Sequence, residues 1–486
     1  MKKASLKQNL AYQMIYEVLI IILPFVTSPY VARILGAEKL GEYSYSYSIA
    51  LYFVLFAMLG IKNHGNREIA AVRDNPQQLN DTFSNIFFVH SIASIFSFMI
   101  YMLYVFRMSG DNEYAMIQSA FVLSAFFDIS WFYFGIERFK TTVVRNTVIK
   151  LINAIGIFTL VRTADDLWKY CAIMAIGNLV SQLILWVPLR KYVKWTKPSK
   201  EQMMRHMRPL ILLFIPVLAI SLYTYMDKII LGMMKNKTEL GYFENAEKAI
   251  NIPQTIIAAF GTVMLPKMSN LAASKNKEAS EYYMSISMKY IMCVAFALSF
   301  GIGGVGTVFA PVFWGKEFTA SGELIMGLAI TIPFLSFANI IRTQYLIPHK
   351  KDREYLISVL IGAVINLTLN LSLVPSLGAK GSMIATVFAE IAVCVVQTIA
   401  VSNILPIAEY IKSFVPFFVF GVVMGVAVLG VLHIRNSVNL VTLILQIFCG
   451  ACVYLTMTIV YLIRTKDPVF LKFIETARKR FLKSHI

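Results

Sequence analysis

The sequence predicts an all-α polytopic membrane protein with about 14 transmembrane helices. Three observations lead to this prediction: long apolar stretches recur along the chain, charged residues are scarce, and the connecting loops alternate between basic and nearly uncharged. Of the 486 residues, 57% are hydrophobic and only 15% are charged. A soluble domain contains about 25% charged residues. The composition therefore indicates a chain whose helices lie in a bilayer.

Each apolar stretch is long enough for one membrane-spanning helix, which needs about 20 residues. A transmembrane β-barrel would show alternating strands of about 10 residues instead, whereas these stretches are continuous. In chain order the stretches begin near Leu10, Tyr43, Phe83, Ala115, Val143, Trp168, Leu210, Gly241, Ile286, Leu324, Leu356, Met383, Phe414 and Leu440.

Basic residues gather on one side of the predicted topology. With both termini placed in the cytoplasm, about 33 Lys and Arg residues fall in cytoplasmic segments and about 11 in external ones. The densest loop runs from Arg190 to Arg208. This bias accounts for most of the net charge of +18, so the charge does not indicate a nucleic-acid partner. We expect both termini to be cytoplasmic.

Several function classes are disfavoured. The longest loops hold about 20 residues, fewer than the ~50 that an independent catalytic domain requires. The sequence contains no G-x-x-x-x-G-K-[ST] motif, so ATP binding in a P-loop is excluded. The five cysteines fall in predicted helices, and the six histidines lack metal-ligand spacing. We expect no catalytic site, metal or cofactor. We expect any uphill transport to be driven by an ion gradient or by a downstream sink for the product.

A weak internal repeat predicts the domain organisation. Ala32–Gly36 (ARILG) and Lys228–Gly232 (KIILG) are each followed by a short polar loop and a Leu-Gly pair. The offset corresponds to six helices, an even number, so both halves insert in the same orientation. The alternative is chance similarity between apolar segments. The predicted domains are a six-helix lobe (1–190), a basic linker (191–208), a second six-helix lobe (209–403), helices 13 and 14 (404–464) and a basic cytoplasmic tail (465–486).

Polar residues inside the predicted helices are the candidate functional groups, since a charge near mid-bilayer costs about 2.5–3.5 kcal/mol. Glu244 and Lys248 alternatively form a local ion pair, because residues four apart share a helix face. Asn366 and Asn370 alternatively bond neighbouring helices. Glu390 is either a cation or proton site, or a neutral acid in a packed interface. The residues for which we predict a functional role are Arg33, Arg67, Asp227, Lys228, Glu244, Lys248, Arg342, Asn366, Asn370 and Glu390.

Several segments, in order and spacing, resemble the polysaccharide-exporting branch of the multidrug/oligosaccharidyl-lipid/polysaccharide (MOP) flippase superfamily. The predicted count of fourteen helices resembles the Wzx-type O-antigen and capsule repeat-unit transporters. The resemblance covers nearly the whole chain. It is carried by SPYVARILGAEKLGEYSY (28–45), LGIKNHGNREIA (59–70), WFYFGIERFK (131–140), MDKIILG (226–232), LGYFENAEKAI (240–250), TVMLPKMS (262–269) and NLTLNLSLVPSLGAKGSMIATVFAE (366–390).

This resemblance implies two six-helix bundles in a MATE-like V, plus two C-terminal helices. It also implies an undecaprenyl-pyrophosphate-linked oligosaccharide as cargo, a location in the bacterial cytoplasmic membrane, and membrane lipids, a polysaccharide polymerase and a chain-length regulator as partners. Arg and Lys can pair with the pyrophosphate. We expect substrate contacts from Arg33, Arg67, Lys228, Lys248, Arg342, Asn366 and Asn370, and ion coupling from Asp227, Glu244 and Glu390.

Three alternatives remain open at this stage. A MATE-type drug or cation antiporter would share the fold but favour an acidic cavity. A lipid II or teichoic-acid precursor flippase would differ only in cargo. A membrane-bound polymerase or glycosyltransferase would usually need a large external loop or a cytosolic domain.

Overall fold

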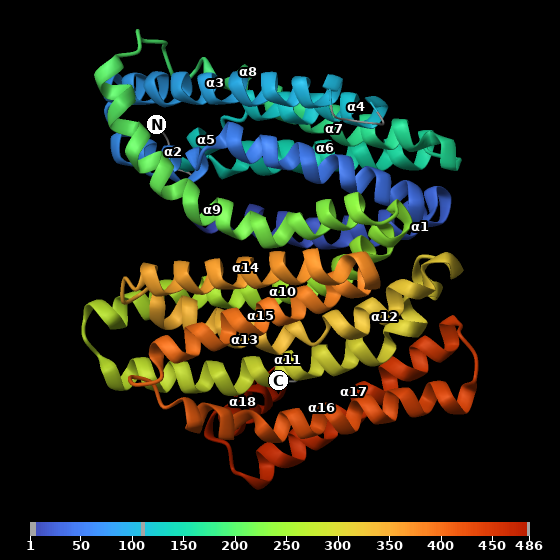
Figure 1. Ribbon diagram of the computed structural model, residues 1–486. Coiled ribbons are helices and arrows are strands. Elements are labelled where there is room, and N and C mark those ends of the chain that lie inside the picture. The colour runs from blue at the N-terminus through green and yellow to red at the C-terminus, as the bar shows by residue number, and fades with distance from the viewer. Residues whose placement is uncertain (1–5, 108–111, 484–486) are drawn as a thin grey trace. The chain divides into compact units, whose positions relative to one another are not determined.

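The computed structural model describes residues 6–107 and 112–483, without the side chains of residues 6–21, 112, 223, 473 and 477–483. Its described part consists of helices joined by short connections (Figure 1). Twelve helices in these residues are long and apolar enough to cross a membrane, and one pair of helices bent by 43°, Lys316–Leu328 and Thr331–Leu346, would make a thirteenth if the pair forms one span.

Helix α1 accounts for the difference from the expected fourteen. It extends over Leu6–Met58, and its 53 residues are interrupted at Gly36, where φ is 75° and ψ is 174°. At 1.5 Å per residue the helix would be about 80 Å long, more than twice the ~30 Å of a bilayer core. The glycine break therefore divides α1 into two spans. The all-α fold of about 14 spanning helices is confirmed.

The chain forms two compact units, which we call the first unit (Met1–Glu244 with Ala363–Ala385) and the second unit (Asn245–Gly362 with Thr386–Ile486). These units group residues by contact, and the predicted lobe, linker and tail boundaries stay a prediction.

The first unit contains α1, the 3-10 turn η1 and the start of α10, together with the end of α14 and the start of α15. Its other helices are α2 (Ile61–Val72), α3 (Pro76–Arg107), α4 (Asn112–Phe126), α5 (Ser130–Gly135), α6 (Phe139–Leu160), α7 (Leu167–Ile184), α8 (Trp186–Leu189) and α9 (Lys200–Met234); η1 is Ala164–Asp166.

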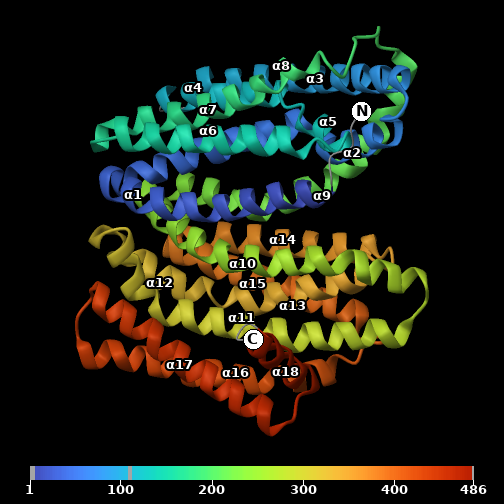
Figure 2. The same ribbon diagram turned by 180° about the vertical axis from the view of Figure 1, so that it is seen from behind.

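An aromatic core holds the first unit together around Trp131 of α5. The Trp131 ring stacks on Phe83 of α3, with centroids 5.4 Å apart, and is fully buried. Helix α2 packs against this ring through Gly65, where a Cβ would lie 2.5 Å from Trp131 Cε3. Figure 2 shows α2 and α5 together at one end of α3, α4, α6 and α7. The short helices thus form one wall of the unit's interior.

The Leu-Gly pairs of the weak repeat lie against each other. A Cβ on Gly41 of α1 would lie 1.7 Å from the Lys237 carbonyl oxygen of α10, and one on Gly241 would lie 1.9 Å from the Ala37 carbonyl oxygen. Only glycine permits this backbone approach from both sides. The Lys237 ammonium lies 3.1 Å from the centroid of the Tyr45 ring and reinforces the crossing.

The second unit contains most of α10 together with the helices that follow it. These are α10 (Lys237–Ala273), α11 (Lys277–Phe313), α12 (Thr319–Leu328), α13 (Thr331–Ile341), α14 (Asp352–Leu377), α15 (Ala379–Val401), α16 (Ile407–Arg435), α17 (Leu440–Arg464) and α18 (Pro468–Lys483), with the short turns η2 (Lys316–Phe318) and the π-helical η3 (Arg342–Leu346).

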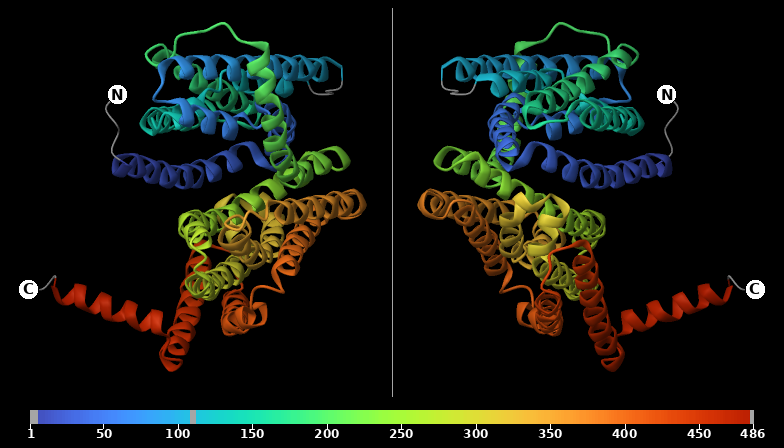
Figure 3. Two further views of the ribbon diagram at one scale, coloured as in Figure 1. Left: turned by 90° about the vertical axis from the view of Figure 1, so that its left-hand side faces the viewer. Right: turned by 90° about the vertical axis from the view of Figure 1, so that its right-hand side faces the viewer.

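Helix α11 is the centre of the second unit, where it packs on α12, α13, α16 and α17. The Tyr454 hydroxyl of α17 donates a 2.6 Å hydrogen bond to the Cys293 carbonyl of α11. At the corner before α18, Asp467 accepts bonds from Lys289 and Tyr290 of α11 and from the Phe470 amide. Burial opposes ionisation there, but these donors outweigh it and lower the pKa of Asp467. Figure 3 shows α18 leaving α17 at a wide angle from this corner.

Candidate functional site

The first unit contains a polar cavity of about 610 Å³. Its wall is formed by α1, α2, α4, α5, α6 and α7 and by the α4–α5 connection. Amides are prominent in this wall, and each amide side chain offers both donors and an acceptor. The cavity can therefore bind a ligand that carries many hydroxyl groups. The asparagines that line it are Asn63, Asn66, Asn146, Asn153 and Asn178.

The charged part of the wall is predominantly basic. Lys62, Arg145 and Lys150 line the cavity with one carboxylate, Asp128. Lys62 Nζ is 3.9 Å from Asp128 Oδ2, and the other carboxylate oxygen accepts a 2.9 Å bond from the Ser130 amide. Three cations against one anion give the wall a net positive charge, which favours neutral or anionic ligands over cationic ones.

Arg145 is held in a fixed position. Its Nη1 donates to the Ser181 carbonyl at 2.8 Å and to Gln182 Oε1 at 2.9 Å. Both partners belong to α7, while Arg145 belongs to α6. These bonds explain how an arginine that is only 7% exposed is tolerated in a spanning helix.

Aromatic side chains supply flat surfaces in the same cavity. Tyr43 and Tyr47 of α1 line it and stack on each other at 5.6 Å. Tyr43 also meets Tyr170 of α7 edge-on at 4.8 Å. Trp131, fixed by the aromatic core, completes this side of the wall. Rigid aromatic faces combined with a few polar groups are typical of small-molecule sites.

Gln118 of α4 is a polar lining residue whose side-chain nitrogen has an unmet capacity to donate. The side chain is 1% exposed, and its Nε2 has no hydrogen-bond partner among the described residues. A buried donor left unpaired costs about 1–3 kcal/mol. A ligand oxygen in the cavity would satisfy this donor. Gln118 is therefore better explained by a role in ligand binding than by a contribution to the stability of the fold.

A second polar cluster surrounds Asp227 of α9. Asn370 Nδ2 donates to Asp227 Oδ1 at 2.9 Å, and Asn366 Nδ2 lies 3.3 Å from Oδ2. The Ser382 hydroxyl of α15 donates to Asn370 Oδ1 at 2.8 Å. All four side chains are buried, and Asn366 Oδ1 has no partner among the described residues. The structure thus brings together Asp227, Asn366 and Asn370, three of the residues predicted as functional.

A third cluster joins two more of the predicted residues. Lys228 Nζ of α9 lies 2.7 Å from Glu244 Oε2 of α10. The Ser44 hydroxyl of α1 donates to the same oxygen at 2.9 Å. The side chains of Lys228 and Glu244 are 12% and 17% exposed, respectively. Their ion pair is therefore shielded from solvent and connects three helices.

The other predicted residues lie outside these clusters. Arg33 is exposed on α1, and Arg67 is exposed on α2 beside Glu68, 3.3 Å away. Lys248 Nζ donates to Asn245 Oδ1 at 3.4 Å. Glu390 is 7% exposed on α15. Arg342 lies in a separate small pocket of the second unit.

The prediction from sequence missed the polar cavity of the first unit as a site. Its residues come from several helices and carry no motif of their own. A weak signal was present, because amides such as Asn146, Asn153 and Asn178 interrupt otherwise apolar predicted helices.

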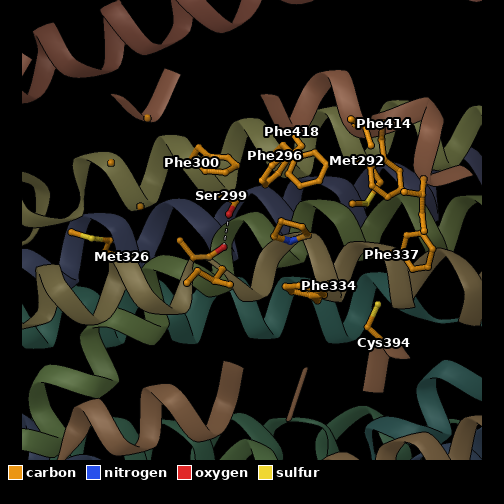
Figure 4. Close-up of a pocket in the computed structure, with 18 of the residues that line it drawn as sticks. Met292, Phe296, Ser299, Phe300, Met326, Phe334, Phe337, Cys394, Phe414 and Phe418 are labelled. Carbon is orange, nitrogen blue, oxygen red and sulfur yellow. Dashed lines mark hydrogen bonds between the residues drawn. The ribbon is translucent and has the colours of Figure 1, made fainter. Parts of the chain in front are cut away.

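The second unit contains an apolar groove of about 790 Å³. Figure 4 shows Phe296, Phe300, Phe334 and Phe418 among the side chains that line it. The Ser299 hydroxyl donates to the Ala329 carbonyl at 2.7 Å and is satisfied within the protein. The groove therefore offers an almost entirely hydrocarbon surface, in contrast to the amide-rich cavity of the first unit.

Comparison with known proteins identifies the family. The model of a family described as polysaccharide biosynthesis protein matches residues 6–272. The chain belongs to this family. A second family model, the lipid II flippase MurJ, matches residues 141–449. The predicted resemblance to the MOP flippases is confirmed.

Individual relatives agree with this family. A protein of Shigella dysenteriae that carries the name of an O-antigen transporter is 23% identical over 76% of this chain and 93% of its own length. An Escherichia coli K12 protein with the same name is 22% identical over 79% of this chain and 94% of its own. A solved structure of the lipid II flippase MurJ, in an inward closed conformation, covers 94% of this chain and 100% of its own at 13% identity, with a TM-score of 0.78. That structural likeness shows the fold.

Proposed function

We propose that this protein flips lipid-linked oligosaccharide repeat units across the bacterial cytoplasmic membrane by alternating access, with both termini in the cytoplasm. The cargo serves O-antigen, capsule or exopolysaccharide synthesis. The observation that carries the proposal is the polar cavity, which places amides and tyrosine faces inside a chain that is 57% hydrophobic. The names of the Shigella and Escherichia relatives support the same cargo.

The parts of such a cargo match different surfaces of the protein. Sugar hydroxyls both donate and accept hydrogen bonds, as do the amides around Asn146 and Asn178. An isoprenoid tail is pure hydrocarbon, and the phenylalanine-lined groove of the second unit gives it an apolar surface. A polymerase and a chain-length regulator would receive the cargo on the external side.

Cation coupling is proposed at Asp227. A carboxylate beside the unpaired Asn366 Oδ1 offers oxygen ligands to Na⁺ or a protonation site to H⁺. Glu244 is the weaker candidate, because Lys228 already balances its charge. Glu390 remains a candidate as a buried acid of α15.

A lipid II or teichoic-acid precursor flippase is the second candidate, since the MurJ family model covers residues 141–449. It would share the mechanism and differ in cargo. A MATE-type drug or cation antiporter is less compatible with a cavity wall that holds three cations and one carboxylate. Complementation of a strain depleted of its lipid II flippase distinguishes the oligosaccharide flippase from the lipid II flippase. Under our proposal, expression of this protein does not restore growth of that strain.

Deletion of the gene tests the proposal in cells. We expect surface polysaccharide to disappear while completed, unpolymerised repeat units accumulate on undecaprenyl carriers at the cytoplasmic leaflet. Expression of the wild-type gene from a plasmid should restore both. Normal surface polymer together with altered sensitivity to cationic drugs would refute the flippase and favour the antiporter.

A further inference from the structure

A small pocket of about 280 Å³ in the second unit surrounds Arg342. Helix α10 contributes Asn251, Gln254 and Thr255, and α13 contributes Ser336 and Asn339. Arg342 follows directly as the first residue of η3. The pocket is separate from the cavity of the first unit and shares no lining residue with it.

Arg342 has no carboxylate within ion-pair distance in the described part of the chain. The Tyr355 ring lies beside it, with the ring centroid 5.6 Å from Arg342 Cζ. Acidic side chains are absent from the described lining of the pocket. A cation in a membrane-spanning region normally has a partner, because leaving it unpaired there is costly. The pocket therefore has a positive charge that a bound anion can neutralise.

The amides around Arg342 are also available to a ligand. Among the described residues, the side chains of Asn251, Gln254 and Asn339 form no hydrogen bond with the protein. Each amide carries two N–H donors, and a guanidinium carries five in a planar fork. This excess of donors around one cation suits a ligand that has several acceptor oxygens and negative charge.

The local backbone explains how these groups come together. The Ile347 amide bonds the Arg342 carbonyl at 3.0 Å, five residues back, so the helix widens to a π turn at this point. Such turns are frequent at functional sites. Gly261 of α10 leaves room for Asn339, since a Cβ there would lie 2.4 Å from Asn339 Oδ1. The close crossing of α10 and α13 brings the amides of both helices into one pocket with Arg342.

The pocket lies near a basic loop. Shortly after η3 the chain passes through Lys350 and Lys351, and Arg353 follows in the first turn of α14. By the positive-inside rule we expect this loop, and hence this end of α13, on the cytoplasmic side. Lipid carriers are loaded on that side in the function proposed above.

We propose that Arg342, with Asn251, Gln254 and Asn339, binds the diphosphate group of a prenyl-diphosphate-linked cargo on the cytoplasmic side. This inference rests on the proposed function and assigns the diphosphate to a particular pocket. The planar guanidinium bonds two phosphate oxygens at once, and the amides bond the remaining ones. A free diphosphate anion shares this chemistry, so the prenyl chain must be tested separately.

Isothermal titration of the purified full-length protein with farnesyl diphosphate, inorganic diphosphate and farnesol tests the pocket. We expect farnesyl diphosphate to bind more tightly than either other compound. Arg342→Ala should weaken this binding about 10- to 100-fold, and Arg342→Lys should weaken it less. Equal binding of inorganic diphosphate would overturn the assignment to a prenyl-linked cargo.

Two further variants guard against loss of folding. Gln254→Glu keeps Arg342 and the side-chain shape but adds a carboxylate that competes for the guanidinium, so binding should fall. Arg353→Ala removes an exposed charge from the first turn of α14 and should leave binding unchanged. Wild-type affinity in Arg342→Ala and Gln254→Glu, or an equal loss in Arg353→Ala, would overturn the inference.

Flipping by the same preparations in proteoliposomes separates the two proposals. If wild-type protein flips lipid-linked oligosaccharide and Arg342→Ala flips and binds equally well, only the diphosphate pocket is refuted. If wild-type protein flips none, yet its farnesyl diphosphate binding depends on Arg342, the flippase proposal fails and the pocket stands.

Discussion

The reciprocal glycine contact between α1 and α10 gives a quantitative prediction. A Cβ on Gly41 would lie 1.7 Å from the Lys237 carbonyl oxygen, whereas carbon and oxygen atoms in contact are about 3.3 Å apart. The two helices would have to separate by about 1.5 Å, because backbone atoms cannot rotate away. Overpacking costs about 1–3 kcal/mol and occasionally more. We expect Gly41→Ala to destabilise the protein by about 3 kcal/mol.

Gly241→Ala should have a similar effect, since its Cβ would lie 1.9 Å from the Ala37 carbonyl oxygen. The matched control is Gly156→Ala on α6, where the nearest atom is 3.5 Å away. Alanine there should be neutral or stabilising by about 0.5–1 kcal/mol. Thermal and denaturant unfolding of the purified variants in detergent measure the difference. If Gly41→Ala and Gly241→Ala are both as stable as Gly156→Ala, the close crossing is refuted.

Four other predictions concern the polar groups. Gln118→Leu should keep or raise thermal stability, because it removes an unpaired buried donor. It should also lower flipping in proteoliposomes, because that donor is no longer available to the cargo. Unchanged flipping would contradict the role of the cavity. Asp227→Asn should abolish the dependence of the flipping rate on a Na⁺ or H⁺ gradient, and a retained dependence would exclude Asp227 as the coupling site. In a double-mutant cycle of denaturant unfolding, Lys228→Ala and Glu244→Ala should show a coupling of about 1–3 kcal/mol, and additive effects would contradict the ion pair. Asp467→Asn should lower the thermal stability at pH 7. Because the folded-state pKa of Asp467 is lowered, its contribution is present above about pH 4 and is lost as the pH falls. A difference from wild type that persists at low pH would contradict this linkage.

The fold was largely predictable because the bilayer imposes it. Only helices satisfy their own backbone hydrogen bonds in hydrocarbon, so apolar length and loop charge suffice to find the spans. Even the division of α1 at Gly36 follows from length, since the sequence placed separate spans near Leu10 and Tyr43. The Leu-Gly pairs of the weak repeat also contain Gly41 and Gly241, the two glycines at which α1 and α10 approach each other.

The sites were less predictable because they depend on which helix faces meet. Lys228 and Glu244 are on different helices, and the sequence suggested the nearer Lys248 as a partner for Glu244. Asp227 and Asn370 were each recognised as costly in a membrane, but their 2.9 Å bond requires the register of α9 against α14. The amides of the first-unit cavity were individually unremarkable, since isolated asparagines in spanning helices usually bond neighbouring helices.

The central claim is tested most directly by flipping with purified protein. Proteoliposomes carrying undecaprenyl-diphosphate-linked oligosaccharide are treated with a membrane-impermeant glycosidase, and the cleaved fraction is followed over time. We predict that cleavage proceeds beyond the outer leaflet in vesicles with wild-type protein, and more slowly with Gln118→Leu. Cleavage that stops at the outer leaflet, as in protein-free vesicles, would contradict the account.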